Sequence, residues 1–381
     1  MSKFEQSAEE VGTIRKDVIE LCTAVGKPIL KLTDADYHDH NLDILLDKYE
    51  SAYRINIQIF NELQHTITGW PGGKPGADDT NRPERAEPPY KRVLIFSPHP
   101  DDDVISMGGT LIRLVDQGHE VHIAYQTSGA IAVFDEDVMQ FADFFRSLTL
   151  ELDDESSISN EFFNQVRNEI RAGVEGQSDG EAVRTAKTLI RVSEAKAACR
   201  MIGVPDENIH FLNMPFYHSG EPQKFPLGPH DIHLNAALLD RLNPHQIYAA
   251  GDLADPHGTH KVCLQAVYGA IQELSDSDWL GECRFWLYRG AWHEWPIDEI
   301  DMAVPMSPDE VKRKRQAIFK HQSQKDTARF PGDDNREFWQ RAESRNRRLA
   351  ERYDALGLAE YEAMEAFKRI DIEEILNDSL P

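Results

Sequence analysis

The stretch "FSPHPDDDVISMGG", residues 96–109, sets one histidine and three consecutive aspartates directly after an apolar run. That run, residues 93–96, is followed by Ser97 and two prolines, which is typical of a β-strand that ends there. The apolar spacing from Ile105 to Leu114 is typical of a helix, so the carboxylates lie in the turn between strand and helix. One aspartate there would cap the helix, but three like charges in contact are unfavourable unless something neutralises them. The turn therefore predicts a cation-binding site.

The composition excludes several classes of partner. The chain has 381 residues and a formal net charge of -25, so it lacks the basic surface that phosphate backbones require. No apolar run approaches the roughly 20 residues of a membrane helix, and the first residues, "MSKFEQ", lack the apolar core of a signal peptide. We therefore expect a cytoplasmic protein that binds neither nucleic acid nor membrane. A homo-oligomer is compatible with the sequence.

The cysteines predict no disulfide framework and no thiolate metal site. Four are present and none forms a CxxC pair, which favours reduced thiols; they are Cys22, Cys199, Cys263 and Cys283. Any metal must then be held by His, Asp or Glu side chains.

Alternating patterns along the chain predict an α/β fold. Strands are expected at residues 92–97, 120–127, 208–214, 246–250, 284–289 and 302–305. Helical periodicity separates most of them, notably at 104–117, 182–202, 231–242 and 259–274. This alternation indicates a Rossmann-like, mostly parallel sheet with helices on both faces. Gly108 and Gly109, inside the first of these helices, indicate a close contact between helix and strand.

The remaining segments suggest how the chain is organised. Residues 8–66 are helical in pattern and residues 69–90 are rich in Gly, Pro and charge, so residues 1–85 are interpreted as an N-terminal helical extension and linker. Residues 86–381 are interpreted as one α/β domain. Within it, the acidic stretch at about 134–181 is an insertion that we interpret as a lid. Amphipathic helices are expected at about 309–356, and the many charges at 335–352 indicate a solvated helix face.

A second polar turn supplies further ligands. In "AAGDLADPHGTH", residues 249–260, His257 and His260 follow a strand and precede a helical pattern. Ligands of open α/β sheets bind beyond the carboxyl ends of the strands, where both turns lie. A dinucleotide is excluded, because its turn would be glycine-rich, whereas the acidic turn would repel phosphate. Three N or O ligands with a fourth position left for water are typical of catalytic zinc, and iron or another divalent ion suits the same donors.

At this point the sequence resembles a known family. "SPHPDDDVISMGG" is similar to the [AS]HPDD[ED] signature of the LmbE-like, or PIG-L, family of zinc-dependent de-N-acetylases, and "PHGTH" to its second HxxH motif. "RVSEAKAACRMIGV", "HFLNMP" and "KRQAIFKHQSQ" resemble three later family segments in the same order, and the likeness covers most of residues 90–330. The stretches "GWPGGKP…RPERAEPPYKRV" and "YRGAWHEWPIDEIDMAVPMSP" resemble the deacetylase module that follows a glucosamine-6-phosphate deaminase-like domain in some bacterial proteins.

The resemblance implies a role for each site residue. His99, Asp102 and His260 would bind Zn²⁺, with Fe²⁺ as the alternative, and Asp101 would be the general base. His257 would polarise or protonate the reacting amide. Two departures from the family pattern are Asp103, which replaces the usual Glu and is expected to orient His99 or the backbone, and "HGTH" in place of "HPDH".

Contacts to substrate stay open at this stage. Arg191 resembles the family's substrate arginine, with an ordinary helical pair to Glu194 as the alternative. Ser128 or Gly129 either approaches substrate or forms a plain turn. Tyr288, Trp292 and Trp295 either stack on a sugar or belong to the core. The single histidines near strand edges are interpreted as structural; they are His119, His122, His210 and His245.

The sequence therefore predicts a zinc-dependent hydrolase that removes the acetyl group from an N-acetylglucosamine-like amino sugar, a small-molecule substrate. Two alternatives remain. The fold could serve as a sugar-binding or assembly module without turnover, or the enzyme could be a zinc amidase that acts on a thiol-conjugated sugar.

Overall fold

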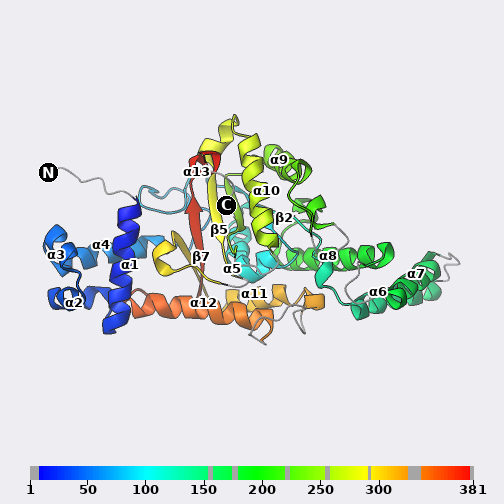
Figure 1. The fold of residues 1–381 in the computed structure, drawn as a ribbon, viewed down its shortest axis with the longest axis horizontal. Helices are drawn as coiled ribbons and strands as arrows, with labels where there is room; N and C mark the ends of the chain where they lie inside the picture. The colour runs from blue at the N-terminus through cyan, green and yellow to red at the C-terminus, as the bar shows by residue number, and fades with distance from the viewer. Residues whose placement is uncertain are drawn as a thin grey trace.

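The computed structural model describes residues 8–152, 158–173, 179–218, 224–253, 258–290, 293–324 and 336–377. These residues form an α/β fold around a seven-stranded sheet with the strand order β3-β2-β1-β4-β5-β7-β6 (Figure 1). Strands β1 to β5 pair in parallel, whereas β7 is antiparallel to both of its neighbours. The expected fold class, a mostly parallel sheet with helices on both faces and helices at the N-terminus, is confirmed.

The helices and strands have the following bounds. The strands are β1 (Arg92–Ser97), β2 (Glu120–Tyr125), β3 (Ile209–Phe211), β4 (Gln246–Ala250), β5 (Arg284–Tyr288), β6 (Met302–Met306) and β7 (Ala363–Ile370). The α-helices are α1 (Ala8–Val25), α2 (Asp34–Asp39), α3 (Asp43–Tyr49), α4 (Ala52–Thr66), α5 (Asp102–Asp116), α6 (Asp135–Glu151), α7 (Ile158–Ala172), α8 (Glu181–Ile202), α9 (Pro229–Leu242), α10 (Thr259–Glu273), α11 (Pro308–Ile318), α12 (Phe338–Ala355) and α13 (Ile372–Asn377).

The sheet separates two hydrophobic cores because successive strand residues point to opposite faces. In β1, Leu94 and Phe96 join the core that contains residues of α9, α10 and the N-terminal helices. Val93 and Ile95 join the other core, which contains residues of α5, α8 and α11. Because both faces of β1 are buried, its middle residues 93–96 are all apolar, as is usual in parallel sheets. The acidic turn follows directly after the carboxyl end of β1.

Strand β7 also shapes α5, the helix that follows the acidic turn. Helix α5 departs from helical geometry at Met107, where φ is -133° and ψ is 24°. The backbone N–H groups of Gly109 and Thr110 donate to the carboxylate of Glu365 on β7, at 2.9 and 2.6 Å. Glu365 therefore acts as a cap for the second part of α5. Lys314 on α11 donates to the same carboxylate at 2.7 Å, and both residues are buried.

Close packing around α5 explains why two of its residues are glycines. A Cβ atom on Gly109 would lie 2.1 Å from Sδ of Met306, and one on Gly108 would lie 3.0 Å from Cγ of Lys314. Both contacts come from the elements that pack on α5. The expected close contact between helix and strand is therefore present at Gly109, next to β6, whereas the neighbour of Gly108 is the helix α11.

The N-terminal helices and the α6–α7 pair lie at opposite ends of the molecule, on either side of the sheet (Figure 1). Residues 67–68, which follow α4, contact β6, because the N–H of Thr68 donates to the carbonyl of Ala303 at 2.9 Å. Helices α6 and α7 share a small core with α8 that includes Val138, Phe163 and Val183. The structure thus gives the acidic segment 134–181 two helices; its role as a lid stays a prediction.

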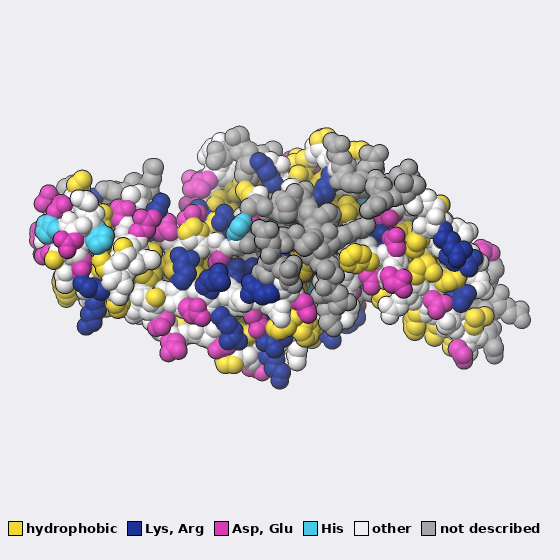
Figure 2. Space-filling model, turned by 60° about the horizontal axis from the view of Figure 1, so that its bottom comes forward, with side chains coloured by type: hydrophobic (Ala, Val, Ile, Leu, Met, Phe, Trp, Pro, Cys, Tyr) yellow, Lys and Arg dark blue, Asp and Glu magenta, His cyan; other side chains and the backbone are white. Residues whose placement is uncertain are grey.

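The surface carries charge of both signs. Figure 2 brings the side with α11 and α12 forward and shows Lys and Arg side chains gathered in its middle. Exposed members of these helices include Lys312, Arg347, Arg348 and Arg352. Within the described part of the chain, no helix is both long enough and apolar enough to cross a membrane.

Candidate active site

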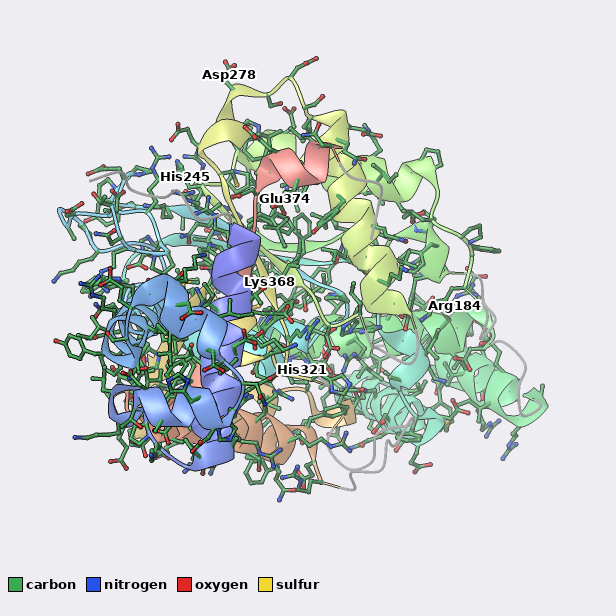
Figure 3. All side chains as sticks on the ribbon, turned by 60° about the vertical axis from the view of Figure 1, so that its left-hand side comes forward. Arg184, His245, Asp278, His321, Lys368 and Glu374 are labelled. Atoms are coloured by element: carbon green, nitrogen blue, oxygen red, sulfur yellow. The ribbon has the colours of Figure 1, made fainter. Side chains whose placement is uncertain are left out.

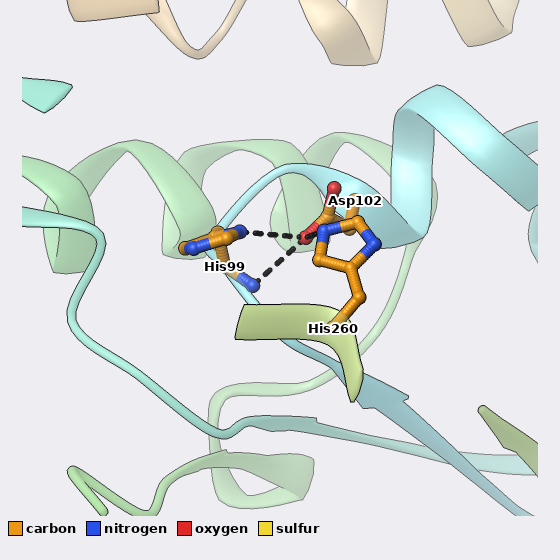
Figure 4. Close-up of side chains that lie close together, drawn as sticks. All are labelled: His99, Asp102 and His260. Atoms are coloured by element: carbon orange, nitrogen blue, oxygen red, sulfur yellow. Dashed lines mark hydrogen bonds and ion pairs between the residues drawn. The ribbon is translucent and has the colours of Figure 1, made fainter. Parts of the chain in front are cut away.

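Two strand ends bring three ligand-type side chains together. His99 lies in the turn between β1 and α5, Asp102 is the first residue of α5, and His260 lies in the first turn of α10, which follows β4 (Figure 4). Because β1 and β4 are parallel neighbours, their carboxyl ends meet at one edge of the sheet. One donor atom from each of the three side chains lies within 4.8 Å of the others.

The distances fit one small cation. Oδ2 of Asp102 lies 3.1 Å from Nδ1 of His99 and 3.3 Å from Nε2 of His260. Metal–ligand bonds of zinc to N and O are about 2.0–2.2 Å, so tetrahedral ligands lie roughly 3.4 Å apart. The backbone N–H of His99 also donates to Oδ2 of Asp102 at 2.9 Å, and this hydrogen bond fixes the carboxylate against the turn. Two imidazoles and one carboxylate are donors that zinc and iron both accept.

The charge state of Asp102 suits a ligand. Burial alone would raise its pKa, but the contacts with His260 and His99 outweigh burial and hold the pKa of Asp102 well below its ordinary value. The carboxylate is therefore ionised, as metal binding requires.

The neighbouring aspartate, Asp101, has a different partner. Its Oδ2 lies 3.0 Å from Nη2 of Arg191 on α8, and Arg191 is 1% exposed. Burial raises the pKa of Asp101, and the Arg191 guanidinium opposes this rise. Arg191 also lies 3.7 Å from Glu194, whose carboxylate accepts hydrogen bonds from the N–H and the hydroxyl of Ser323 at 2.7 and 2.8 Å. Asp101 is thus the end of a buried chain of polar groups.

The third aspartate, Asp103, makes its side-chain hydrogen bonds with residues of β1 and β2. It accepts hydrogen bonds from the Ser97 hydroxyl at 3.3 Å and from the Tyr125 hydroxyl at 3.1 Å. Ser97 in turn donates to the carbonyl of His99 at 2.6 Å. Burial raises the pKa of Asp103 to about 7. Through Ser97, Asp103 is linked to the backbone carbonyl of His99.

The remaining predicted residues divide into three groups. His257 and Trp292 lie outside the described residues. Arg191 is buried rather than part of a solvated helical face, and a Cβ on Gly129 would lie 3.0 Å from its Nε. Tyr288 is buried and donates to the carbonyl of Phe96, while Trp295 is buried beneath the guanidinium of Arg289. Both aromatic residues belong to the core.

The single histidines make local contacts. His119 accepts from the N–H of Lys91, and His245 accepts from the N–H of Arg92. His122 and His210 stack with their rings 5.4 Å apart at the edge of the sheet.

One part of the site has no functional assignment from the sequence. The segment from His321 to Gln324, which follows α11, reaches Glu194 through Ser323 and borders the same small pocket as Asp101. The family resemblance of "KRQAIFKHQSQ" marked this segment, but residue types and spacing alone indicate no contact with the acidic turn.

The chain is similar in sequence to known proteins. Residues 94–271 match the sequence profile of the PIG-L family, described as GlcNAc-PI de-N-acetylase. A curated relative from Bacteroides thetaiotaomicron, named a glucosamine-6-phosphate deaminase-like protein, is 54% identical over 357 residues. That match covers 93% of this chain and 54% of the relative, so the chain spans about half the length of the relative.

Solved structures with similar folds carry several activities. N,N'-diacetylchitobiose deacetylase from Pyrococcus horikoshii aligns with a TM-score of 0.45 and 20% identity over 74% of this chain and 85% of its own. The zinc inhibited form of teicoplanin deacetylase aligns with a TM-score of 0.42 and 17% identity, over 74% and 99%. A 4-carboxy-2-hydroxymuconate hydratase from Pseudomonas putida aligns with a TM-score of 0.46 and 16% identity, over 74% and 96%. These TM-scores are too low for a conclusion about activity.

Proposed function

Because residues 94–271 form a PIG-L, or LmbE-like, domain, we propose that the protein is a metal-dependent hydrolase that removes the acetyl group from an N-acetylglucosamine-like amino sugar or its conjugate. One observation carries the proposal: His99, Asp102 and His260 converge at one sheet edge, directly beside the buried carboxylate of Asp101. This is the donor set of a catalytic metal site with a base next to it.

In this proposal His99, Asp102 and His260 hold the divalent ion, which we take to be zinc. Zinc in such a site supplies Lewis acidity, which lowers the pKa of water and polarises a carbonyl. The protein's own part begins with Asp101, which accepts a proton from the attacking water. As the new C–O bond forms and the C–N bond breaks, Asp101 returns that proton to the amine nitrogen. Acetate and the free amine are the products.

Other residues position these groups. Arg191 holds the carboxylate of Asp101 through their 3.0 Å ion pair, so we assign Arg191 first to orienting the base. A direct contact of Arg191 with substrate, and a role for His257 near the reacting amide, stay part of the proposal. Asp103 acts on the backbone of the turn through Ser97.

The test is a release assay with metal control. Acetate is measured from N-acetylglucosamine, its phosphate and a thiol-conjugated sugar, with protein that has been loaded with zinc or stripped by a chelator. We expect turnover of at least one substrate only with metal, and the preferred substrate separates the amino-sugar deacetylase from the thiol-conjugate amidase. Equal rates with and without metal would contradict the proposal.

A substitution separates catalysis from binding. Asp101→Asn should lower kcat by about 10²–10⁴, the usual contribution of a general acid–base residue, while the protein still binds one metal ion. Asp47→Asn, at an exposed position of α3 among the N-terminal helices, is the matched control and should keep full activity. If the wild type hydrolysed none of these substrates and Asp101→Asn changed neither the cellular function nor the ligand affinity, a sugar-binding module without catalysis would be the better interpretation.

A further inference from the structure

A small pocket lies beside Asp101, between the first turn of α5, the end of α11 and the start of α12. Its volume is about 20 Å³, which is room for roughly one water-sized or methyl-sized group. Most of its wall is apolar and consists of Ile105, Ile318, Phe319 and Phe338. Trp339 completes the wall, and Asp101, His321, Gln324 and Glu337 supply polar atoms. The pocket therefore joins the proposed base to a space that suits a very small, mainly apolar group.

His321 is the unusual member of this wall. It is 3% exposed, and neither of its ring nitrogens has a hydrogen-bond partner among the described residues. Figure 3 shows it in the interior of the molecule, far from labelled surface residues such as Asp278. Burial lowers the pKa of His321 well below its ordinary value, so the ring is neutral and offers one donor and one acceptor. Buried polar atoms nearly always have partners, so His321 indicates a group that enters the pocket.

The loop that carries His321 is held in place. Ser323 donates to Glu194 through both its N–H and its hydroxyl, and the side-chain amide of Gln324 donates to the carbonyl of Ala132 at 3.3 Å. His321 therefore occupies a fixed position relative to α8, the helix whose Arg191 pairs with Asp101. A fixed wall can select a group by its size.

We propose that this pocket receives the end of the substrate's acyl group and restricts it to two carbons. The inference rests on the proposed function, in which Asp101 serves the water that attacks the acyl carbon. That carbon must lie about 3–3.5 Å from the attacking oxygen, so its substituent lies one bond further, in the space that Asp101 borders. The methyl group of acetyl fills this space against Ile318 and Phe319.

The pocket should distinguish larger acyl groups by their polarity as well as by their size. The ethyl group of a propionyl substrate adds a carbon that meets the apolar wall. The hydroxymethyl group of a glycolyl substrate has the same number of heavy atoms, but its hydroxyl can bond the free donor or acceptor of His321. The pocket thus predicts the order acetyl, then glycolyl, then propionyl. The difference between acetyl and propionyl should be at least about 10-fold in kcat/KM, the usual effect of one methylene in a fitted pocket.

The experiment compares three acyl groups on the same sugar. The kcat/KM of the metal-loaded full chain is measured with N-acetyl-, N-glycolyl- and N-propionylglucosamine. Phe319→Ala, or Phe319→Leu if the first variant folds poorly, should bring the ratio of acetyl to propionyl close to one. Phe60→Ala makes the same truncation on α4, remote from the site, and should leave the ratio unchanged. His321→Leu should remove the advantage of glycolyl over propionyl.

Failure of this inference differs from failure of the proposed function. Turnover with the same acyl ratio in wild type and Phe319→Ala would overturn the pocket assignment alone. If no acylated sugar were hydrolysed, the proposed function would fall, and the pocket would be tested by calorimetric binding of acetate, glycolate and propionate to the metal-loaded protein. A preference for acetate that disappears in Phe319→Ala supports the pocket, whereas equal binding of all three acids overturns it.

Discussion

Replacing Glu365 by leucine should destabilise the protein strongly, because it removes one half of a buried ion pair and the cap of a broken helix. Glu365 accepts from Lys314 at 2.7 Å, from the N–H of Gly109 at 2.9 Å, and from the N–H and hydroxyl of Thr110 at 2.6 Å each. Breaking a buried pair by removing one partner costs about 3–5 kcal/mol. We therefore expect Glu365→Leu to lower the free energy of unfolding by about that amount, most of it from Lys314, which is left buried without its counter-ion.

The double variant separates the charge from the cap. Lys314→Met combined with Glu365→Leu should recover most of the loss, since a buried pair replaced by apolar residues of similar volume is often neutral. Urea denaturation of the wild type, both single variants and the double variant gives the coupling energy between the two side chains. Burial already lowers the pKa of Lys314 in the wild type. The stability lost in Glu365→Leu should therefore decrease from neutral to alkaline pH, because Lys314 loses its proton and is then buried without a charge. A loss below about 1 kcal/mol, or a double variant no more stable than Glu365→Leu, would refute this reasoning.

Three further predictions concern the metal, the packing of α5 and the pH dependence. Zinc at 100 times its dissociation constant should stabilise the wild type by about 2.7 kcal/mol, which corresponds to a rise of roughly 3 °C in Tm for a chain of this length. Asp102→Asn should abolish this rise in Tm. The same rise in both proteins would argue against the metal site. Gly109→Ala places a methyl group 2.1 Å from Sδ of Met306 and should cost about 1–3 kcal/mol in urea denaturation, whereas Gly281→Ala meets no atom within 4 Å and should be nearly neutral. Burial lowers the pKa of His210 to about 4, below the value of about 6.5 expected in the unfolded chain, so the unfolded state takes up the proton first. The stability that His210 contributes is then complete above about pH 6.5 and is lost as the pH falls toward 4; His210→Gln should flatten this part of the stability profile, and superimposable profiles would show that another group is responsible.

Hydrophobic pattern was enough to predict most of the sheet. The six strands expected from the sequence all exist, and those at Arg92–Ser97 and Gln246–Ala250 have the expected bounds. In these strands local sequence and tertiary burial agree, because both faces of a central parallel strand are covered and most of its residues, apart from Arg92 and Gln246 at the two strand starts, are apolar or small. The expected strand at 208–214 is shorter, Ile209–Phe211, since it lies at the edge of the sheet.

Strand β7 could not be predicted from its own residues. "AMEAFKRI" contains residues that favour helices as much as strands and a charge at its third position. Glu365 is tolerated inside the sheet only because Lys314, 51 residues earlier in the chain, neutralises it. Such a compensation depends on the packing of α11 and is invisible to any local pattern.

In the candidate site, too, some contacts could be predicted from the sequence and others could not. Two turns at the ends of neighbouring parallel strands must meet, so the proximity of His99, Asp102 and His260 follows from fold class and motif position. The pairing of Arg191 with Asp101 does not, because it depends on how α8 crosses α5. The sequence allowed a substrate contact or a solvated pair with Glu194, and the structure adds a buried ion pair with Asp101.

The density of negative charge in the turn is explained by three separate environments. Asp101 is balanced by the guanidinium of Arg191. Asp103 has a pKa raised by burial to about 7 and is held by two hydroxyl groups, so it need not carry a full charge. Asp102 is ionised and lies beside the imidazoles of His99 and His260. A divalent cation bound between these three side chains would balance the charge of this carboxylate, which is why we expect stability and metal content to rise together.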